Sequence, residues 1–367
     1  MQVKSKAVVF RGENLTVHVE EILVDPPGPG EVMIKMAACG VCHSDLSVTN
    51  GTLPLPPPIV LGHEGAGVIA QVGSGVTDFK VGDHVISSFV NTCGKCRYCV
   101  TGRPNLCGAT PPMVLFGGHL RTSDAAGKPL NVMAGCGVMA EYATLHENSV
   151  VKIAQDAPLD RCALIGCGVM TGWGAVCNTA KVEPGSTCVV FGVGGVGLSA
   201  ISGCVAAGAS MIIAVDMLAN KLEMAKTFGA THVIDASKSP NAVKEIRNLT
   251  NGGADYAFEC VGHGDIVAQA YGSVCKGGTA VVVGVARPDN TTTIKTATLA
   301  FEEKTLKGSY YGSTRPRYDF PRLVGLYQAG KLKLDELITK RYGIDQAPQA
   351  FDDLAQGRNA RGVIVFD

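Results

Sequence analysis

Apolar residues along the first 150 positions come in short runs that glycine and proline turns separate. SKAVVF (5–10), EVMIKMAA (31–38), GAGVIAQVG (65–73) and DHVISSF (83–89) each have the length of a strand. None of them continues into a long apolar period of 3.6 residues, which would indicate a helix. The pattern predicts a small β-barrel-like domain.

The pattern changes after about residue 170. Apolar, strand-like runs then alternate with helical patterns, beginning with TCVVFG (187–192), a helix from Gly195 and MIIAVD (211–216). Continuous apolar strands with helices between them are typical of a parallel sheet covered on both faces. Six such strands fit a doubly wound sheet. The series continues with NKLEMAKTFG, HVID, NAVKEIRNLT, YAFECVG, AVVVGV and TLKGSYYG.

The last segment of the chain returns to short mixed elements and ends in RGVIVFD, which has the pattern of a strand. A chain of 367 residues exceeds what one hydrophobic core usually supports, so two domains are expected. We expect an α/β protein with a β-barrel domain over residues 1–168 and 311–367. The doubly wound domain is expected over residues 169–310.

Charge is balanced, with 32 Lys and Arg residues against 32 Asp and Glu residues. This balance argues against a nucleic-acid or anionic-membrane partner, because both need a local excess of positive charge. No apolar run reaches the roughly 18 residues of a transmembrane helix, and the first residues, MQVKSKAVVF, lack a signal-peptide pattern. We therefore expect no membrane partner and a cytoplasmic location.

The run VVFGVGGVGLSA contains Gly192, Gly194 and Gly197 in the spacing G-x-G-x-x-G. A strand precedes it, a helix follows it, and the next strand ends in Asp216, the context of a dinucleotide-binding turn. The helix N-terminus would face the pyrophosphate. Asp216 would accept hydrogen bonds from the adenosine ribose, which favours NAD over NADP, and Lys221 could add a contact. The alternative is a structural turn without a ligand.

Four cysteines lie within fifteen residues, spaced C-x2-C-x2-C-x7-C. In a cytoplasmic chain this density favours a closed tetrahedral zinc site, which leaves no coordination position for a substrate. A disulfide pair is disfavoured by the compartment, and a nucleic-acid-binding zinc ribbon has few basic residues nearby. The four expected ligands of this structural zinc are Cys93, Cys96, Cys99 and Cys107.

A second possible metal site consists of Cys42, His63 and Cys167. Two thiolates and one imidazole leave a fourth position open, which is the arrangement of a catalytic zinc. Taken singly, each of the three would more often be a structural residue of the core.

The motifs together carry a resemblance that no single motif does. CGVCHSD, GHEGAGVI, GDHV, the four cysteines, ALIGCGVMTGWGA, GVGGVG, AVD, FECVG and VVVGV follow one another in this order. Over essentially its whole length the sequence resembles a zinc-dependent alcohol dehydrogenase of the medium-chain dehydrogenase/reductase family, long-loop and class I/III-like. The resemblance implies a GroES-like β-barrel catalytic domain and a Rossmann coenzyme domain.

The resemblance also implies roles for individual residues and two zinc ions per chain. Cys42, His63 and Cys167 would bind the catalytic zinc, with Glu64 as an acid near the metal. Asp45 would orient the histidine ligand. Ser44 would bind the alcohol and accept its proton, and Leu53 and Phe89 would line an apolar substrate channel.

Further matches imply contacts with NAD. His43 and Arg361 would contact the pyrophosphate, the alternative for each being a solvated surface charge, and Thr171 would touch the nicotinamide. The other implied cofactor residues are Gly192, Gly194, Gly195, Val196, Gly197, Asp216, Lys221, Val283 and Val285.

The implied reaction is the oxidation of primary alcohols with an apolar or aromatic body to aldehydes, and the reverse, by hydride transfer to NAD. The implied partners are thus a small alcohol or aldehyde and, from the long segment between Cys107 and Cys167, a second copy in a homodimer. Ser47 stands where some members carry a histidine that ends the proton relay.

Three alternatives stay open. The first is a nicotinoprotein that keeps NAD bound and passes electrons to another acceptor. The second is an S-(hydroxymethyl)glutathione dehydrogenase, which is disfavoured because Pro111 stands where that branch carries an arginine. The third is a non-catalytic scaffold or redox sensor on the same fold.

Overall fold

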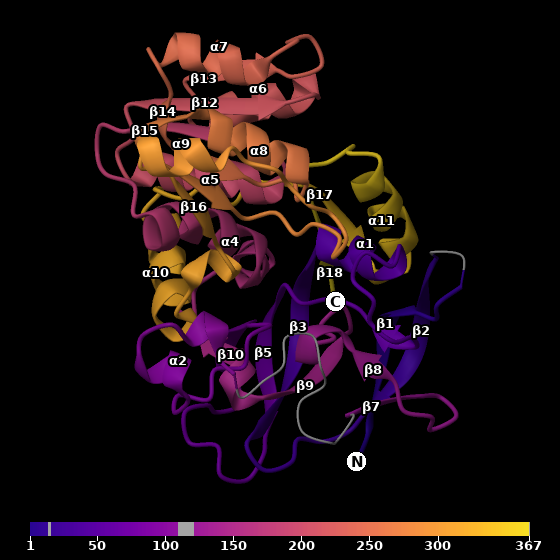
Figure 1. Ribbon diagram of the computed structural model, residues 1–367. Coiled ribbons are helices and arrows are strands. Elements are labelled where there is room, and N and C mark those ends of the chain that lie inside the picture. Colours follow the sequence, from indigo (N-terminus) through magenta and orange to yellow (C-terminus); the bar gives the residue numbers. More distant parts are fainter. Residues whose placement is uncertain (14–15, 109–120, 367) are drawn as a thin grey trace. The chain divides into compact units, whose positions relative to one another are not determined.

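The computed structural model describes residues 1–13, 16–108 and 121–366 (Figure 1). The chain divides into two compact units. Unit 1 comprises Met1–Cys167 and Arg315–Asp367, and unit 2 comprises Gly168–Thr314. The sequence placed the corresponding boundaries after residues 168 and 310.

Unit 2 contains one six-stranded parallel sheet with the strand order β13-β12-β11-β14-β15-β16. This is the order 3-2-1-4-5-6 of a dinucleotide-binding fold, so the predicted doubly wound sheet is confirmed. Helices connect the strands and pack against the sheet (Figure 1). Its elements are α4 (Gly168–Gly174), η5 (Ala175–Ala180), β11 (Thr187–Phe191), α5 (Gly195–Ala206), β12 (Met211–Asp216), α6 (Ala219–Phe228), β13 (His232–Asp235), α7 (Ala242–Leu249), β14 (Ala254–Glu259), α8 (Gly264–Ser273), β15 (Val274–Val282), α9 (Thr296–Phe301), β16 (Thr305–Gly308) and η6 (Tyr311–Ser313).

Unit 1 contains two sheets, mostly antiparallel, with the orders β7-β2-β1-β4-β8 and β10-β6-β5-β3-β18-β17, and β9 pairs with β3 as well. Its strands are β1 (Val3–Phe10), β2 (Val17–Val24), β3 (Glu31–Val41), β4 (Ile59–Val60), β5 (Gly65–Val72), β6 (His84–Ser87), β7 (Thr122–Asp124), β8 (Asn131–Val132), β9 (Tyr142–His146), β10 (Val150–Lys152), β17 (Ile338–Gly343) and β18 (Arg361–Val365). Its helices are α1 (His43–Thr49), α2 (Arg97–Val100), η1 (Pro104–Leu106), η2 (Met133–Gly135), η3 (Glu147–Ser149), α3 (Leu159–Cys162), η4 (Ala163–Gly166), α10 (Pro316–Gln328), η7 (Ile344–Gln346) and α11 (Ala347–Ala355).

The last strand of the chain lies inside a sheet that the first part of the chain builds. β18 pairs antiparallel with β3, with Gly362 opposite Val41 and Val365 opposite Ala38, and its other edge pairs with β17. Val363, Ile364 and Phe366 of this segment are buried, and Val365 is half-buried. The terminal segment therefore completes unit 1, and it brings Arg361 next to the end of β3.

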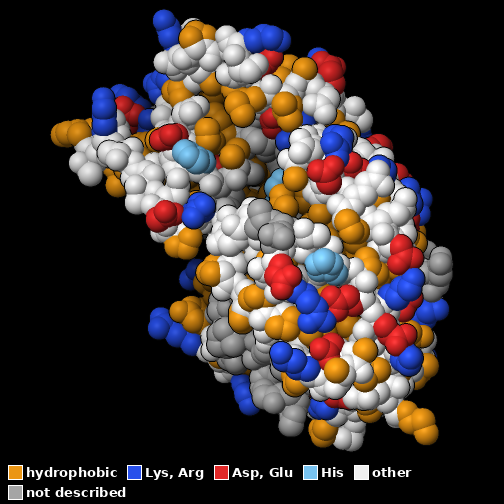
Figure 2. All heavy atoms as spheres, turned by 90° about the vertical axis from the view of Figure 1, so that its right-hand side faces the viewer, with side chains coloured by type: hydrophobic (Ala, Val, Ile, Leu, Met, Phe, Trp, Pro, Cys, Tyr) orange, Lys and Arg blue, Asp and Glu red, His pale blue; other side chains and the backbone are white. Residues whose placement is uncertain are grey.

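Each unit has its own hydrophobic core. In unit 2 the core forms where the apolar strands β11, β12 and β14 meet their helices, with Val189, Ile213 and Ala257 fully buried. In unit 1 the core lies between the strands and α11. Acidic and basic side chains are interspersed on the face shown in Figure 2, as the balanced composition leads one to expect.

Within the described residues, no single helix combines the length and the apolar character needed to cross a membrane. The bent pair Leu159–Gly166 and Gly168–Ala180 meets the criterion only when taken together, and most of its residues are buried.

A carboxylate network fixes α11 to β17. Asp353 accepts hydrogen bonds from Lys340 Nζ at 2.7 Å, from the Tyr342 hydroxyl at 2.6 Å and from Arg358 Nε at 2.7 Å. The bond from Lys340, followed by those from Tyr342 and Arg358, holds the pKa of Asp353 well below its usual range. A carboxyl group with a lowered pKa stabilises the fold above its unfolded pKa, and this contribution disappears as the pH falls through the folded pKa.

Asp353→Asn should therefore lower the urea midpoint of unfolding at pH 7, and the difference from wild type should shrink below about pH 4. Unfolding curves between pH 3 and 7 measure this. Asp352→Asn is the matched control, because Asp352 is exposed and its carboxylate bonds only to Arg358 in the described structure. A pH-independent difference between Asp353→Asn and wild type would contradict this account.

Candidate functional site

Two thiols, an imidazole and a carboxylate converge inside unit 1. One donor atom each from Cys42, His63, Glu64 and Cys167 lies within 4.8 Å of every other, and all four side chains are buried. Three of them are the residues that the sequence assigned to a catalytic zinc. Glu64 lies in the same group, so the cluster offers four donors where the sequence analysis counted three and an open position.

The strand ends of unit 1 bring these side chains together. Cys42 directly follows β3 and caps α1, His63 and Glu64 lie in the connection from β4 to β5, and Cys167 directly follows η4. Asp45 fixes this arrangement, because its carboxylate accepts hydrogen bonds from the amides of Cys42 at 3.0 Å and Gly62 at 2.9 Å.

The chemistry of His63 fits a metal ligand. Both ring nitrogens are buried, and neither forms a hydrogen bond within the described structure. Nδ1 lies 3.5 Å from Asp45 Oδ1, a separation at which the carboxylate orients the ring and favours an Nδ1 proton. Nε2 then has a lone pair, and the donor atom of His63 in this group lies within 4.8 Å of both thiols. The contact between the thiols lowers the pKa of Cys42 and raises that of Cys167.

Glu64 forms a buried ion pair with Arg361. The guanidinium Nη2 of Arg361 donates to Glu64 Oε2, and both side chains are buried. Burial raises the pKa of Glu64 to about 7, although Arg361 acts in the opposite direction. The alternative of a solvated surface charge is therefore wrong for Arg361. His43, the other expected pyrophosphate contact, is exposed at the start of α1.

The residues assigned to proton transfer and substrate binding differ in how close they lie to the four donors. Ser44 Oγ is 3.7 Å from Cys42 Sγ, and Ser47 lies one turn further along α1. The Phe89 ring meets the His63 ring edge-on, with a centroid distance of 5.7 Å. Leu53 packs at the margin of the unit 1 core, without a described contact to the four donors.

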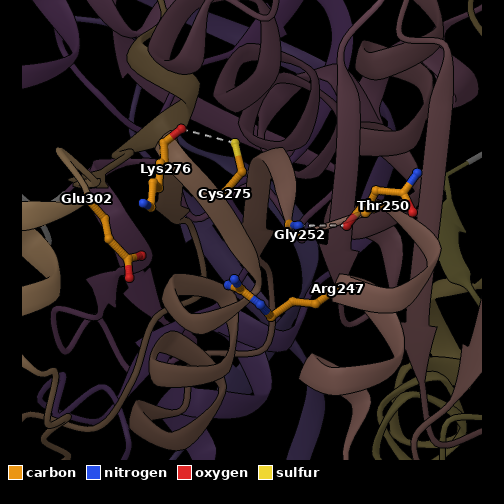
Figure 3. Close-up of a pocket in the computed structure, with 8 residues that line it drawn as sticks. Arg247, Thr250, Gly252, Cys275, Lys276 and Glu302 are labelled. Atoms are coloured by element: carbon orange, nitrogen blue, oxygen red, sulfur yellow. Dashed lines mark hydrogen bonds between the residues drawn. The ribbon is translucent and has the colours of Figure 1, made fainter.

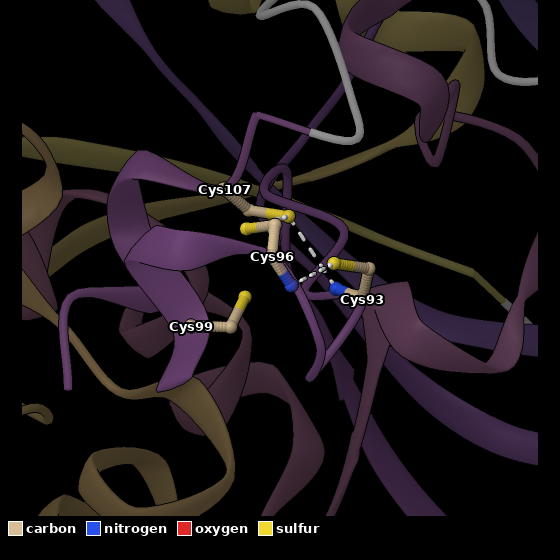
Figure 4. Close-up of side chains that lie close together, drawn as sticks. All are labelled: Cys93, Cys96, Cys99 and Cys107. Carbon is tan, nitrogen blue, oxygen red and sulfur yellow. Dashed lines mark hydrogen bonds between the residues drawn. The ribbon is translucent and has the colours of Figure 1, made fainter. Parts of the chain in front are cut away.

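The second thiol cluster is formed by Cys93, Cys96, Cys99 and Cys107. One donor atom of each lies within 4.8 Å of all the others, and Figure 4 shows the four side chains converging from α2 and the loops on either side. Cys96 Sγ is 3.8 Å from Cys107 Sγ. All fourteen cysteines of the chain are free, so the disulfide alternative is wrong in this structure.

Backbone amides prepare this cluster for anionic sulfur. The amide of Cys96 donates to Cys93 Sγ at 3.3 Å, and the amide of Cys93 donates to Cys107 Sγ at 3.4 Å. Hydrogen bonds from the amides of Cys99 and Gly108 lower the pKa of Cys96 to about 6. Four convergent thiols with amide donors fit a closed tetrahedral zinc site.

The three glycines of the fingerprint have distinct geometries in unit 2. Gly192 directly follows β11 and has φ +80°, and a Cβ on Gly197 would lie 1.9 Å from the Gly192 carbonyl oxygen. A side chain at either position would break the turn or separate the helix from the strand. Gly194 is different, because a Cβ there meets nothing within 4 Å. Gly194 lies at the start of α5, next to Gly195 and Val196. A pyrophosphate needs such open space to approach the backbone closely.

Asp216 ends β12 beside this turn. Its carboxylate accepts from the amides of Val193 at 2.9 Å, Met217 at 2.8 Å and Leu218 at 3.1 Å, which fixes its position at the edge of the sheet. The remaining expected cofactor residues of unit 2 lie at various points: Lys221 half-buried on α6, Thr171 half-buried on α4, Val283 buried after β15 and Val285 exposed after β15.

A separate pocket of about 370 Å³ lies in unit 2 (Figure 3). It is lined by the end of α7 with Arg247, by Cys275 and Lys276 of β15 and by Glu302. Cys275 is near the start of β15, and the pocket thus lies at the amino ends of the strands. Dinucleotides bind outside the carboxyl ends, where the fingerprint lies, so this pocket is not the expected cofactor site.

Sequence reasoning missed three features. It did not pair Arg361 with Glu64, it gave Phe89 no contact with His63, and it gave no role to Glu259, which lies buried at the end of β14. FECVG was recognised as a motif, and its buried acid was the available signal for Glu259. Pro111 lies outside the described residues.

Two family models match the chain. The "alcohol dehydrogenase GroES-like domain" matches residues 28–155, and the "zinc-binding dehydrogenase" model matches residues 195–329. The chain is 45% identical over 372 residues to "putative alcohol dehydrogenase D" of Mycobacterium tuberculosis, covering 99% of this chain and 100% of the relative. It is 44% identical over 371 residues to "NDMA-dependent alcohol dehydrogenase" of Amycolatopsis methanolica, covering 99% of both.

Among solved structures, the benzyl alcohol dehydrogenase of Acinetobacter calcoaceticus superposes with a TM-score of 0.92 at 36% identity, covering 100% of both chains. The family models and the full-length relatives agree with the two-unit fold of this structure. The chain therefore belongs to the zinc-dependent alcohol dehydrogenases of the medium-chain family, oxidoreductases that use zinc and a nicotinamide cofactor.

Proposed function

We propose that this enzyme oxidises primary alcohols with an apolar or aromatic body to aldehydes, and catalyses the reverse, by hydride transfer with NAD. The observation that carries the proposal is the buried convergence of Cys42, His63 and Cys167, with an imidazole that has no other hydrogen-bond partner in the described structure. These residues would hold the catalytic zinc. When bound, zinc supplies a Lewis acid that polarises an alcohol or aldehyde oxygen.

The residues of unit 1 orient and protect this centre. Asp45 holds the His63 ring, and Arg361 holds the Glu64 carboxylate at the edge of the donor set. Because Glu64 is paired with a cation, it can lie near the thiols without leaving an isolated buried charge. The edge of Phe89 against His63 supplies an apolar wall, which supports a substrate with an apolar or aromatic body. The likeness to a benzyl alcohol dehydrogenase supports the same class.

Ser44 is proposed to accept the alcohol proton. Its hydroxyl lies beside Cys42, and the half-buried Ser47 follows it by one turn of α1. A serine hydroxyl passes a proton on but does not hold one near neutral pH, whereas a histidine does.

Ser47→His should therefore make alcohol oxidation less sensitive to pH. Between pH 8 and 6 we expect the rate to fall about tenfold per unit in wild type and about threefold in the variant, because an imidazole stores the proton. Steady-state rates at saturating alcohol measure the slope. Ser47→Ala is the control and should keep the steep profile. A Ser47→His profile that overlays that of wild type would exclude Ser47 from the relay.

A second candidate function concerns the fate of the cofactor. The relative from Amycolatopsis methanolica is named NDMA-dependent and aligns over 99% of both chains. This likeness supports a nicotinoprotein, in which NAD stays bound and electrons pass to another acceptor. Such an enzyme would carry cofactor after purification and would not respond to added NAD.

One assay separates the candidates. Protein of measured zinc content is tested with straight-chain, aromatic and terpenoid alcohols under two conditions. In the first, NAD is added and the absorbance of the NADH formed is followed. In the second, NDMA is added as the electron acceptor and its bleaching is followed. Turnover with free NAD supports the first candidate, and turnover only with NDMA supports the second. An enzyme with full zinc occupancy that converts no primary alcohol under either condition would refute both.

Further parts of the proposal concern stoichiometry and assembly. We propose a second zinc at Cys93, Cys96, Cys99 and Cys107, so that metal analysis gives two zinc ions per chain. The homodimer and the cytoplasmic location stay predictions of the sequence. Light scattering on the purified protein tests the dimer.

A further inference from the structure

We propose that Glu259 is a positioning residue for the cofactor site of unit 2, where its carboxylate fixes the loop beside the dinucleotide fingerprint. This inference rests on the proposed function, because it concerns the binding of the nicotinamide cofactor.

Glu259 lies at the point of the sheet where the strand order reverses. It is the last residue of β14, opposite Phe191 at the end of β11 and Val282 at the end of β15. The connections after β11 and β14 diverge here, and nucleotides bind in the crevice that such a reversal leaves at the carboxyl ends. The side chain is completely buried. An acid is thus held inside the sheet edge that the cofactor would face.

The carboxylate of Glu259 organises the chain that follows β14. Its Oε1 accepts from the amides of Val261 at 2.8 Å and Gly262 at 2.6 Å. Its backbone carbonyl accepts from the amides of Val283 at 2.8 Å and Gly284 at 2.9 Å. One residue therefore holds both the loop after β14 and the loop after β15, and the latter contains Val283, an expected cofactor contact.

These loops meet backbone against backbone, with little tolerance for movement. Gly262 has φ +87°, and a Cβ there would lie 2.5 Å from the carbonyl oxygen of Val285. A Cβ on Gly284 would lie 2.1 Å from the Gly262 nitrogen, and one on Gly192 would lie 2.5 Å from Val261 Cγ2. The loop that Glu259 holds is therefore in contact with the first glycine of the fingerprint on one side and with Val285 on the other.

The cost of burying this acid indicates a use beyond packing. Burial raises the pKa of Glu259, while the surrounding amides act in the opposite direction. Oε2 is buried and forms no hydrogen bond within the described structure. A glutamine has the same shape and could accept the same two amide bonds. Hydrogen bonds to a carboxylate are about twice as strong as those to a neutral oxygen, so the acid holds the loop more firmly than an amide would.

Glu259→Gln and Glu259→Ala test this role through cofactor affinity, fold stability and turnover. We expect the dissociation constant of NADH, measured by fluorescence, to rise about fivefold in Glu259→Gln and more in Glu259→Ala, because hydrogen bonds to the loop weaken and then disappear. The KM for NAD should rise in parallel, with kcat at saturating NAD within about twofold of wild type. If purified wild type retains its cofactor, the dissociation constant cannot be titrated directly. The quantity compared between variants is then the fraction of purified chains that carry the cofactor.

Asp255→Asn is the matched control. Asp255 is an acid of the same strand, near its other end, and its Oδ2 accepts from the Thr187 amide of β11 at 2.8 Å. Like Glu259, Asp255 is therefore an acid of β14 that accepts a backbone hydrogen bond. It lies at the other end of the strand, away from the fingerprint. This variant should bind NADH as wild type does, even if its melting temperature falls.

The outcomes separate this inference from the proposed function. Suppose that wild type binds NADH and that Glu259→Gln binds it equally well and differs only in a lower melting temperature. This result would overturn the positioning role and leave the proposed function intact. Weaker binding in Glu259→Gln but not in Asp255→Asn supports it. Should Glu259→Ala fail to fold, Glu259→Gln alone decides. Wild type that neither binds nor retains a nicotinamide cofactor would refute the proposed function itself.

Discussion

His63→Ala is expected to lower kcat/KM for alcohol oxidation by about a thousandfold or more and to reduce the zinc content by about one ion per chain. The imidazole is one of the donors of the buried cluster, and the two thiols and Glu64 that remain cannot reproduce its geometry. A catalytic metal supplies several kcal/mol of charge stabilisation in the transition state, and each 1.4 kcal/mol corresponds to about a factor of ten. Metal analysis and steady-state kinetics on the same preparation measure both effects.

Two comparisons make this result specific. His146→Ala alters a half-buried histidine of β9 whose Nδ1 accepts from the Asn148 amide, and it should leave zinc and turnover close to those of wild type. Asp45→Asn should fall between the two, with about a 10- to 100-fold loss, because it alters the orientation of the ligand and not the ligand itself. Full zinc content and normal turnover in His63→Ala would refute the catalytic metal site.

Cys96→Ser is expected to remove the other zinc and to open the segment between Cys93 and Cys107. α2 buries no side chain, so hydrophobic burial contributes little to this segment and the metal would supply most of its stability. A structural zinc contributes on the order of 10 kcal/mol to the folding of a small metal-binding peptide. We expect a melting temperature lower by several degrees and rapid proteolysis within residues 93–107.

Cys275→Ser provides the control for this variant. Cys275 is a half-buried cysteine of β15 whose thiol bonds to the Lys276 carbonyl, and it belongs to neither thiol cluster. Its replacement should leave zinc content and protease resistance unchanged. The metal assignment fails if Cys96→Ser keeps two zinc ions per chain and resists proteolysis as wild type does.

The fold could be predicted from the sequence because its signals are local. β11 and β12 are apolar strands of five and six residues that are buried on both faces, so their composition alone identifies them. The helical patterns that follow them mark the alternation. The fingerprint was equally local, and the three glycines differ in the way the spacing implies. The grouping of Cys93, Cys96, Cys99 and Cys107 needed only a short loop.

The rest of the site depends on contacts between distant parts of the chain. Arg361 reaches Glu64 only because β18 pairs with β3, and no local pattern in RGVIVFD indicates that partner. A family position suggested a pyrophosphate contact for Arg361, but it did not reveal the burial of the ion pair. For Glu259 the motif FECVG marked the position, but the hydrogen bonds of its side chain could not be predicted. Its carboxylate bonds to backbone amides two and three residues ahead, and the residue types of those positions carry no sign of it.

The interior position of β18 has a consequence for synthesis on the ribosome. Unit 2 is one continuous segment, so it can fold as soon as its own residues have emerged. Unit 1 must wait, because the edge of β3 that β18 covers stays unpaired until β18 itself has left the exit tunnel. During that interval the sheet that contains β3 exposes an open edge, which is the feature through which chains aggregate. A variant that lacks β18 would keep that edge exposed.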